Sequence, residues 1–301
     1  MSAQGSSRAI LYAFIANLGI ALAKLAAALY TKSGSMLAES IHSFADSGNQ
    51  VLLYLGLSQS QRPADAKHPL GYGKTSYFWS FIVALMLFSM GGLFSIYEGW
   101  HKLHVTEPLN RPWVAMLVLG VSVVLEFGSL AGCLREINKL RGAKPFGKWL
   151  SGTRNAELVV VLGEDIAALV GLVLALGFVA LATLTGNMVF DAIGSIAIGV
   201  VLIIVSIFIA VRIKGLIIGT SAEDDLRIAI DSEIRADPAI RELFNAITLQ
   251  LGPQVMLAAK VRMTPGISID AAAVQINRLE ARIKEKFPEV KWCFVEPDNT
   301  D

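Results

Sequence analysis

The sequence predicts an α-helical polytopic membrane protein with six transmembrane helices, followed by a small cytoplasmic α+β domain in the order α-β-β-α-β. Composition is the first reason: 54% of the 301 residues are hydrophobic, 17% are charged, and the mean hydropathy is +0.56. An ordinary soluble domain is about 45–50% apolar and about 25% charged. The other two reasons are a series of six apolar stretches and a return of polar residues after Arg212.

Six stretches contain the roughly 20 mostly apolar residues that a transmembrane helix needs. They are residues 9–30, 36–57, 77–100, 113–134, 156–183 and 190–211. The first has no small-residue cleavage pattern, so we expect it to be retained as a span. Twelve lysines and arginines lie in the termini and loops on one side of these spans, and three lie in the opposite loops. Because basic residues favour the cytoplasmic side, both termini are predicted to be cytoplasmic.

The remaining residues predict a domain boundary near residue 214, with a transmembrane domain at 1–214 and a soluble domain at 215–301. A helix is predicted at 222–236, and two strands at 243–251 and 254–263 are joined by a Gly252-Pro253 hairpin turn. Ser268 is placed to cap a second helix, which Pro288 ends, and a last strand follows at 290–295.

The second span carries a stripe of polar residues at intervals of three and four, which places them on one helix face. They are Glu39, His42, Ser43, Asp46, Asn49 and Gln50. Ionisable groups at membrane depth normally face a bundle interior or a cavity and mark ion or proton pathways. His42 and Asp46 are one turn apart, so both can reach a single divalent cation.

The fifth span carries Glu164 and Asp165 at its centre, and the fourth carries Glu126. One imidazole with two or three carboxylates suits zinc or manganese better than copper(I). For Glu164 a second interpretation is a protonated carboxyl group that bonds to a neighbouring helix. Glu126 is as well suited to hydrogen bonding between helices as to metal binding or proton transfer.

Other classes of function find little support. The positive charge lies in short loops rather than on one polar face, so nucleic acid is not an expected partner. Cys133 and Cys293 lie in different regions and form no metal pair. An intramembrane metalloprotease would need a His-Glu-x-x-His helix, which the sequence lacks, so no enzymatic activity is expected.

These features together resemble the cation diffusion facilitator family of divalent-metal/proton antiporters. The resemblance is carried by His42-x-x-x-Asp46, by Asp165, by the loop His68-Pro-Leu-Gly-Tyr-Gly-Lys74 and by the α-β-β-α-β tail, and it covers nearly the whole chain. The Leu-Gly-Glu-Asp sequence, with Glu126 and Asn155, resembles the branch that includes an animal mitochondrial zinc transporter.

The resemblance implies a homodimer with a transport site made of two residues on the second span and two on the fifth. His42 and Asp46 match the first pair and Asp165 matches half of the second, but Val161 stands where the family usually has histidine. We expect Glu164 to replace that histidine. The tail contains no histidine, so it is expected to be a dimerisation module without the binuclear zinc site of some members.

The function expected from the resemblance is zinc/proton antiport by alternating access, which exports Zn²⁺ from the cytoplasm through the lipid bilayer. Manganese, cobalt, iron(II) or cadmium fit the same ligand set, and a metal-binding scaffold or sensor without transport remains the alternative. Zinc would be the transported substrate, and no organic cofactor is expected. The short loops suggest a bacterial inner membrane.

Overall fold

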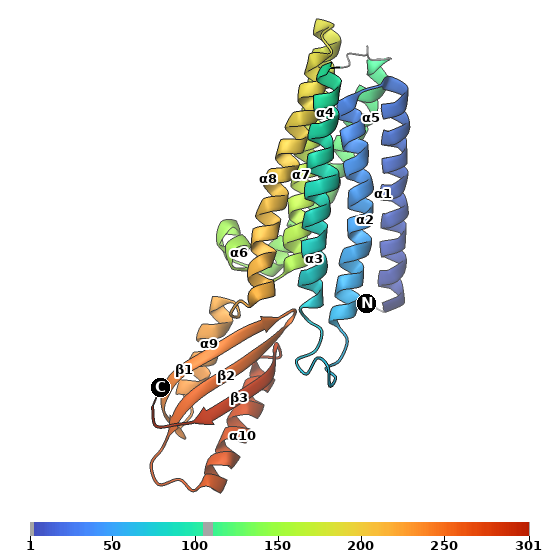
Figure 1. The fold of residues 1–301 in the computed structure, drawn as a ribbon. Coiled ribbons are helices and arrows are strands. Elements are labelled where there is room, and N and C mark those ends of the chain that lie inside the picture. The colour runs from blue at the N-terminus through green and yellow to red at the C-terminus, as the bar shows by residue number, and fades with distance from the viewer. Residues whose placement is uncertain (1–2, 105–110, 301) are drawn as a thin grey trace. The chain divides into compact units, whose positions relative to one another are not determined.

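The computed structural model describes residues 3–104 and 111–300, with side chains from residue 17 onward. The N-terminal part is helical (Figure 1), with elements α1 Ala3–Thr31, α2 Gly34–Ser60, α3 Thr75–Met86, the π-helix η1 Leu87–Leu93, α4 Phe94–His104, α5 Pro112–Arg141, α6 Phe146–Gly152, α7 Ala156–Thr185 and α8 Val189–Ile218. The C-terminal part contains α9 Asp224–Arg235, β1 Ile240–Leu251, β2 Gln254–Met263, α10 Ile269–Lys286 and β3 Val290–Pro297.

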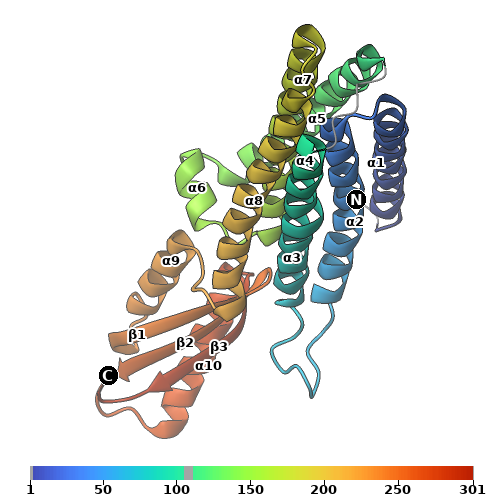
Figure 2. The same cartoon turned by 45° about the horizontal axis from the view of Figure 1, so that its top comes forward.

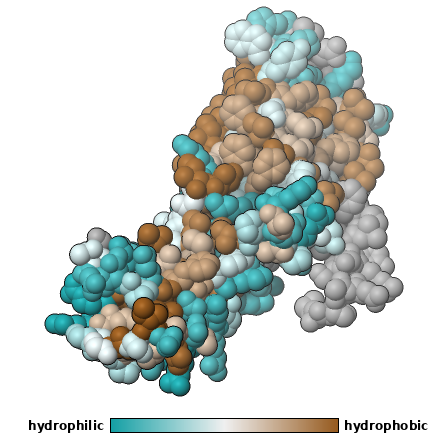
Figure 3. Space-filling view, turned by 60° about the horizontal axis from the view of Figure 1, so that its bottom comes forward, coloured by the Kyte–Doolittle hydropathy of each residue, from teal (hydrophilic) through white to brown (hydrophobic). Residues whose placement is uncertain are grey.

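Four helical segments of the described residues are long and apolar enough to cross a membrane: Thr75–His104, which joins α3, η1 and α4, and then α5, α7 and α8. Helix α2 has 27 residues, but the polar stripe lowers its hydropathy. In α1, the part with described side chains is a shorter apolar helix, Asn17–Thr31. Hydrophobic side chains cover much of the surface of these helices, as the brown areas of Figure 3 show.

Contacts between residues divide the chain into two compact units. The helical unit consists of Met1–Leu55, Trp79–Ala143 and Glu157–Ile213. Its long helices lie side by side in both views of the ribbon (Figures 1 and 2). The second unit consists of Gly56–Phe78, Lys144–Ala156 and Lys214–Asp301, so two connecting segments between helices belong with the C-terminal domain.

The C-terminal domain has the predicted order of elements. Its three strands form a sheet in the order β1-β2-β3, with β1 and β2 antiparallel and β2 and β3 parallel. Alternate residues of β2, from Val255 to Val261, are buried and pack with Ile230 of α9 and Ile283 of α10 in one hydrophobic core. The hydroxyl group of Ser268 accepts a hydrogen bond from the Ala271 amide, which confirms the predicted cap of α10.

Two local features differ from the sequence-based expectations. Strand β1 begins at Ile240, three residues before the predicted start, and register shifts near Glu242 and Asn245 interrupt its alternation. These irregularities hide the start of the strand from a period-two pattern. Helix α6 lies between the predicted spans 113–134 and 156–183, where no helix is predicted, and its seven residues are too few for a periodic signal.

Within the second unit, the loop between α2 and α3 packs against the turn between β1 and β2. The Tyr77 hydroxyl donates to the Gly252 carbonyl over 3.2 Å, and the Lys74 ammonium donates to the Ile217 carbonyl over 3.3 Å. A Cβ atom on Gly73 would overlap the backbone of Leu251. Only glycine at residue 73 therefore allows this close approach of two backbones.

Replacing Gly73 with alanine is expected to separate this loop from the β1–β2 turn, because neither backbone can yield to the added methyl group. Hydrogen exchange at residues 61–74 should become at least about tenfold faster. Gly147→Ala is the matched control, since open space surrounds the Cβ position at residue 147. Unchanged protection of residues 61–74 in Gly73→Ala would contradict the packing described above.

Candidate metal-binding site

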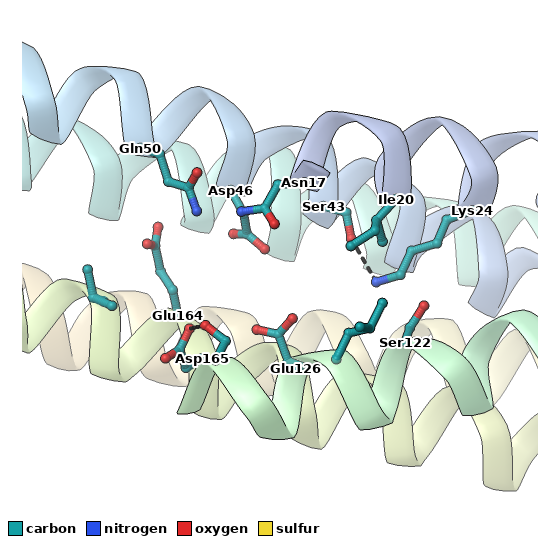
Figure 4. Close-up of a pocket in the computed structure, with 13 residues that line it drawn as sticks. Asn17, Ile20, Lys24, Ser43, Asp46, Gln50, Ser122, Glu126, Glu164 and Asp165 are labelled. Atoms are coloured by element: carbon teal, nitrogen blue, oxygen red, sulfur yellow. Dashed lines mark hydrogen bonds between the residues drawn. The ribbon is translucent and has the colours of Figure 1, made fainter. Parts of the chain in front are cut away.

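A polar cavity of about 140 Å³ lies among α1, α2, α5 and α7, within the helical unit. Its walls carry four acidic side chains: Asp46 from α2, Glu126 from α5, and Glu164 and Asp165 from α7 (Figure 4). Three of these four residues belong to the predicted ligand set. Carboxylates from three helices thus line one cavity in a bundle that is otherwise largely apolar.

The α2 wall of the cavity is formed by the polar stripe, as its spacing predicts. Asp46 and Gln50 project into the cavity (Figure 4), and one Asp46 oxygen has no hydrogen-bond partner in the described part of the chain. His42 is fully buried and lies with Nε2 3.5 Å from Asp46 Oδ2. Neither of its ring nitrogens has a hydrogen-bond partner among the described residues.

His42 does not line the cavity, because its ring lies toward the π-helical segment η1. A Cβ atom built on Gly91 of η1 would lie 3.9 Å from His42 Nδ1. Single turns of π-helix inside α-helices occur often at functional sites. The spacing of four residues places His42 and Asp46 on one side of α2, but only Asp46 lines the cavity.

The two α7 carboxylates lie next to each other in sequence and contact different walls. Glu164 Oε1 accepts a hydrogen bond from Asn49 Nδ2 of α2 over 2.5 Å. Asp165 Oδ1 accepts one from Ser129 Oγ of α5 over 3.2 Å, whereas its Oδ2 has no partner among the described residues. Because adjacent residues point about 100° apart on a helix, Glu164 faces α2 and Asp165 faces α5.

Val161 also lines the cavity, one turn before Asp165. The position where the family resemblance implies a histidine therefore faces the same space with an apolar side chain. Among the residues that the structure describes, no group of three or more His, Cys, Asp and Glu side chains is close enough to hold a single metal ion. The candidate ligands surround the cavity but do not converge on one point.

Lys24 of α1 is a cavity residue that the sequence reasoning missed. Only 3% of its surface is exposed, and its ammonium group donates to Ser43 Oγ over 2.7 Å and to Glu39 Oε2 over 3.4 Å. A signal was present in the sequence, because Lys24 is a basic residue inside a predicted span, whereas the other basic residues of the transmembrane domain lie in termini and loops.

Asp191 has a structural role at the start of α8. Its carboxylate accepts hydrogen bonds from Ser33 Oγ over 2.6 Å, from the Gly34 amide over 2.6 Å and from the Ser35 amide over 3.3 Å. These amides begin α2, so a carboxylate from another helix serves as its N-terminal cap. The polar stripe of α2 is thereby fixed at one end to α8.

Asp191→Ala is expected to lower the free energy of unfolding by about 3 kcal/mol, because it leaves buried amides and a hydroxyl group without an acceptor. The melting temperature of the purified protein in detergent measures this loss. Ser195→Ala is the control, since Ser195 makes a single, longer hydrogen bond of 3.3 Å to the Asp191 carbonyl. Equal melting temperatures for the two variants would show that the carboxylate does not cap α2.

The loop that contains Asp65 and His68 forms its own hydrogen-bond network. One Asp65 oxygen accepts from the Lys67 and His68 amides over 2.9 and 2.7 Å, and the other accepts from the Tyr72 hydroxyl over 2.7 Å. The Tyr72 hydroxyl and the His68 amide hold the pKa of Asp65 below its ordinary value. Both oxygens of the Asp65 carboxylate therefore stabilise the turn of this loop.

Comparison with known proteins identifies the family of the chain. The family model described as the cation efflux transmembrane domain matches residues 10–213. The chain is 35% identical over 259 residues to the mitochondrial proton-coupled zinc antiporter SLC30A9 of Xenopus laevis, a match that covers 85% of this chain and 45% of that protein. It is 32% identical over 254 residues to metal tolerance protein C4 of Arabidopsis thaliana, with 83% and 55% covered.

A relative of lower sequence identity is matched over more of its own length. The chain is 24% identical over 299 residues to magnetosome protein MamB of Paramagnetospirillum magneticum, which covers 95% of this chain and 92% of that protein. By contrast, the chain spans about half the length of the SLC30A9 and C4 proteins. The family match covers the helices that form the cavity, and it agrees with the resemblance seen in the sequence. The chain belongs to the cation efflux family, the cation diffusion facilitators.

Proposed function

We propose that this protein transports a divalent metal cation across a membrane in exchange for protons, and that its substrate is zinc exported from the cytoplasm. The observation that carries this proposal is the cavity among α1, α2, α5 and α7, where four carboxylates face one another inside an apolar helical unit. Such groups are costly at membrane depth and are typical of ion and proton pathways.

We assign the substrate ligands to Asp46, Asp165, Glu164 and His42. The first three line the cavity, and His42 lies one turn from Asp46 with both nitrogens unpaired among the described residues. Rotation of the His42 side chain would bring its imidazole into the cavity beside the Asp46 carboxylate, which it already approaches to 3.5 Å. A set of imidazole and carboxylate donors suits zinc and also manganese.

Proton coupling follows from the chemistry of these ligands. Carboxylates and imidazole bind a metal ion only when they are deprotonated, so protons and the cation compete for the same groups. Loading from the cytoplasm would release protons, and protons arriving at the opposite side would displace the ion after the helices rearrange. Glu126 lines the same cavity and is proposed as a further proton acceptor.

The domain arrangement proposed from the sequence complements this activity. Residues 1–214 would supply six spans with both termini in the cytoplasm, and residues 215–301 would join two protomers. One face of the sheet supports the proposed joining of two protomers. On this face, opposite the one that the helices cover, Ile247, Ala258 and Phe294 lie in one row across the strands. Ile247 is 61% exposed and Phe294 is 56% exposed, as expected of a surface that a second copy covers. The short loops favour a bacterial inner membrane.

Zinc uptake into proteoliposomes with an imposed proton gradient tests the proposal. We expect uptake that requires the gradient and that exceeds manganese uptake under the same conditions. Glu136→Gln is a suitable control variant, because Glu136 lies on α5 but is exposed and pairs with Lys139 outside the cavity. If the purified protein binds zinc but moves neither ion, the scaffold or sensor function replaces transport.

A further inference from the structure

The ion pair between Lys24 and Glu39 lies beside the proposed transport site. Lys24 is the only basic side chain among the described residues that line the cavity, where it faces the same space as four carboxylates (Figure 4). A buried ammonium group normally needs both an opposite charge and hydrogen-bond acceptors. Glu39 supplies the charge, and Ser43, one turn further along α2, supplies the closer acceptor.

Glu39 is held from a second side by α7. The residue is fully buried, and a Cβ atom on Gly171 of α7 would overlap Glu39 Oε1. Because Gly171 has no side chain, the Glu39 carboxylate can occupy this space. Oε1 has no hydrogen-bond partner among the described residues, so Lys24 is the main compensation for the Glu39 charge. The pair joins α1 to α2 at a place where α2 also packs against α7.

We propose that Lys24 and Glu39 form a fixed internal ion pair that sets the electrostatic potential of the cavity and thereby the affinity for the divalent cation. The inference rests on the proposed function, since it assumes that the cavity binds such an ion. The Lys24 ammonium group repels an incoming cation, and the Glu39 carboxylate offsets most of that repulsion. Both effects are stronger inside the helical unit than in bulk water, because the effective dielectric constant there is lower.

A purely structural role of the pair makes a different prediction. If Lys24 and Glu39 only connect helices, removing either partner leaves the other buried and unpaired, and both changes weaken the fold and the site. If the pair sets the potential, the two removals change affinity in opposite directions. Removal of both partners leaves the net charge of the site unchanged. The sign of the change in zinc affinity therefore distinguishes the two roles.

The experiment is zinc binding by the full-length protein in detergent, measured by calorimetry without a proton gradient. We expect Lys24→Met to bind zinc at least about tenfold more tightly than the wild type, and Glu39→Gln at least about tenfold more weakly. The double variant Lys24→Met/Glu39→Gln should return to within about threefold of the wild type. Lys24→Arg, which keeps the positive charge, should also remain close to the wild type.

Loss of affinity in both single variants, or an unchanged affinity in Lys24→Met, would overturn the inference. Melting temperatures identify a variant that fails to fold, and Lys24→Arg then tests whether charge alone maintains the affinity. Zinc uptake by the wild type tests the proposed function separately. A wild type that binds zinc but does not move it contradicts transport and leaves the pattern of affinities intact, whereas a wild type that binds no zinc contradicts the proposed function itself.

Discussion

Asp46→Asn is expected to reduce the initial rate of zinc uptake at least about a hundredfold. The side chain lines the cavity, one of its oxygens has no hydrogen-bond partner among the described residues, and it lies 3.5 Å from His42. Asparagine keeps the size of the side chain but removes the negative charge that a divalent cation requires. Loss of supporting residues around a metal already costs about 10–100-fold, and loss of a ligand should cost more.

Two measurements separate this expectation from a folding defect. The melting temperature of Asp46→Asn should stay within about 2 °C of the wild type, because the change relieves crowding of negative charge around the cavity rather than breaking a hydrogen bond. Zinc affinity in detergent should fall together with the rate of uptake. Normal uptake by Asp46→Asn at subsaturating zinc would remove Asp46 from the ligand set and contradict the proposed site.

Much of the architecture could be predicted because it depends on local periodicity. The polar stripe of α2 follows from its spacing of three and four residues, and it does form one wall of the cavity. The alternation of β2 and the Ser268 cap of α10 are equally local, and the structure confirms both. The π-helix η1 leaves no comparable signal, since its sequence is as apolar as the α-helices around it.

The features that could not be predicted depend on which helices become neighbours. From the sequence alone, Lys24 looks like a lysine whose long side chain reaches toward the edge of the membrane. Its pairing with Glu39 exists only because α1 packs against α2. Asp191 lies at the edge of a predicted span, and the three hydrogen bonds that its carboxylate accepts come from residues more than 150 positions earlier. The orientation of His42 depends on a rotamer, which the spacing of residues does not determine.

Glu164→Gln is expected to lower zinc uptake about 10- to 100-fold, because Glu164 is proposed to replace the histidine missing at residue 161. Glutamine can keep a hydrogen bond with Asn49, so the link between α2 and α7 should survive while the ligand charge is lost. The readout is the rate of uptake as a function of zinc concentration. Uptake at the wild-type rate would show that Glu164 is no essential ligand, and Glu126 or a water molecule would become the candidate.

Val161→His in the Glu164→Gln background tests whether a histidine at residue 161 can restore the zinc uptake that Glu164→Gln loses. Val161 lines the cavity one turn before Asp165, so a histidine there could present an imidazole to an ion that Asp165 binds. We expect the double variant to take up zinc measurably faster than Glu164→Gln alone, and Val161→Leu in the same background to give no increase over Glu164→Gln. Recovery that is confined to histidine would show that a neutral nitrogen donor can replace the Glu164 carboxylate. Failure of rescue in a folded double variant would instead indicate that the site requires the negative charge of the Glu164 carboxylate, which a neutral imidazole does not supply.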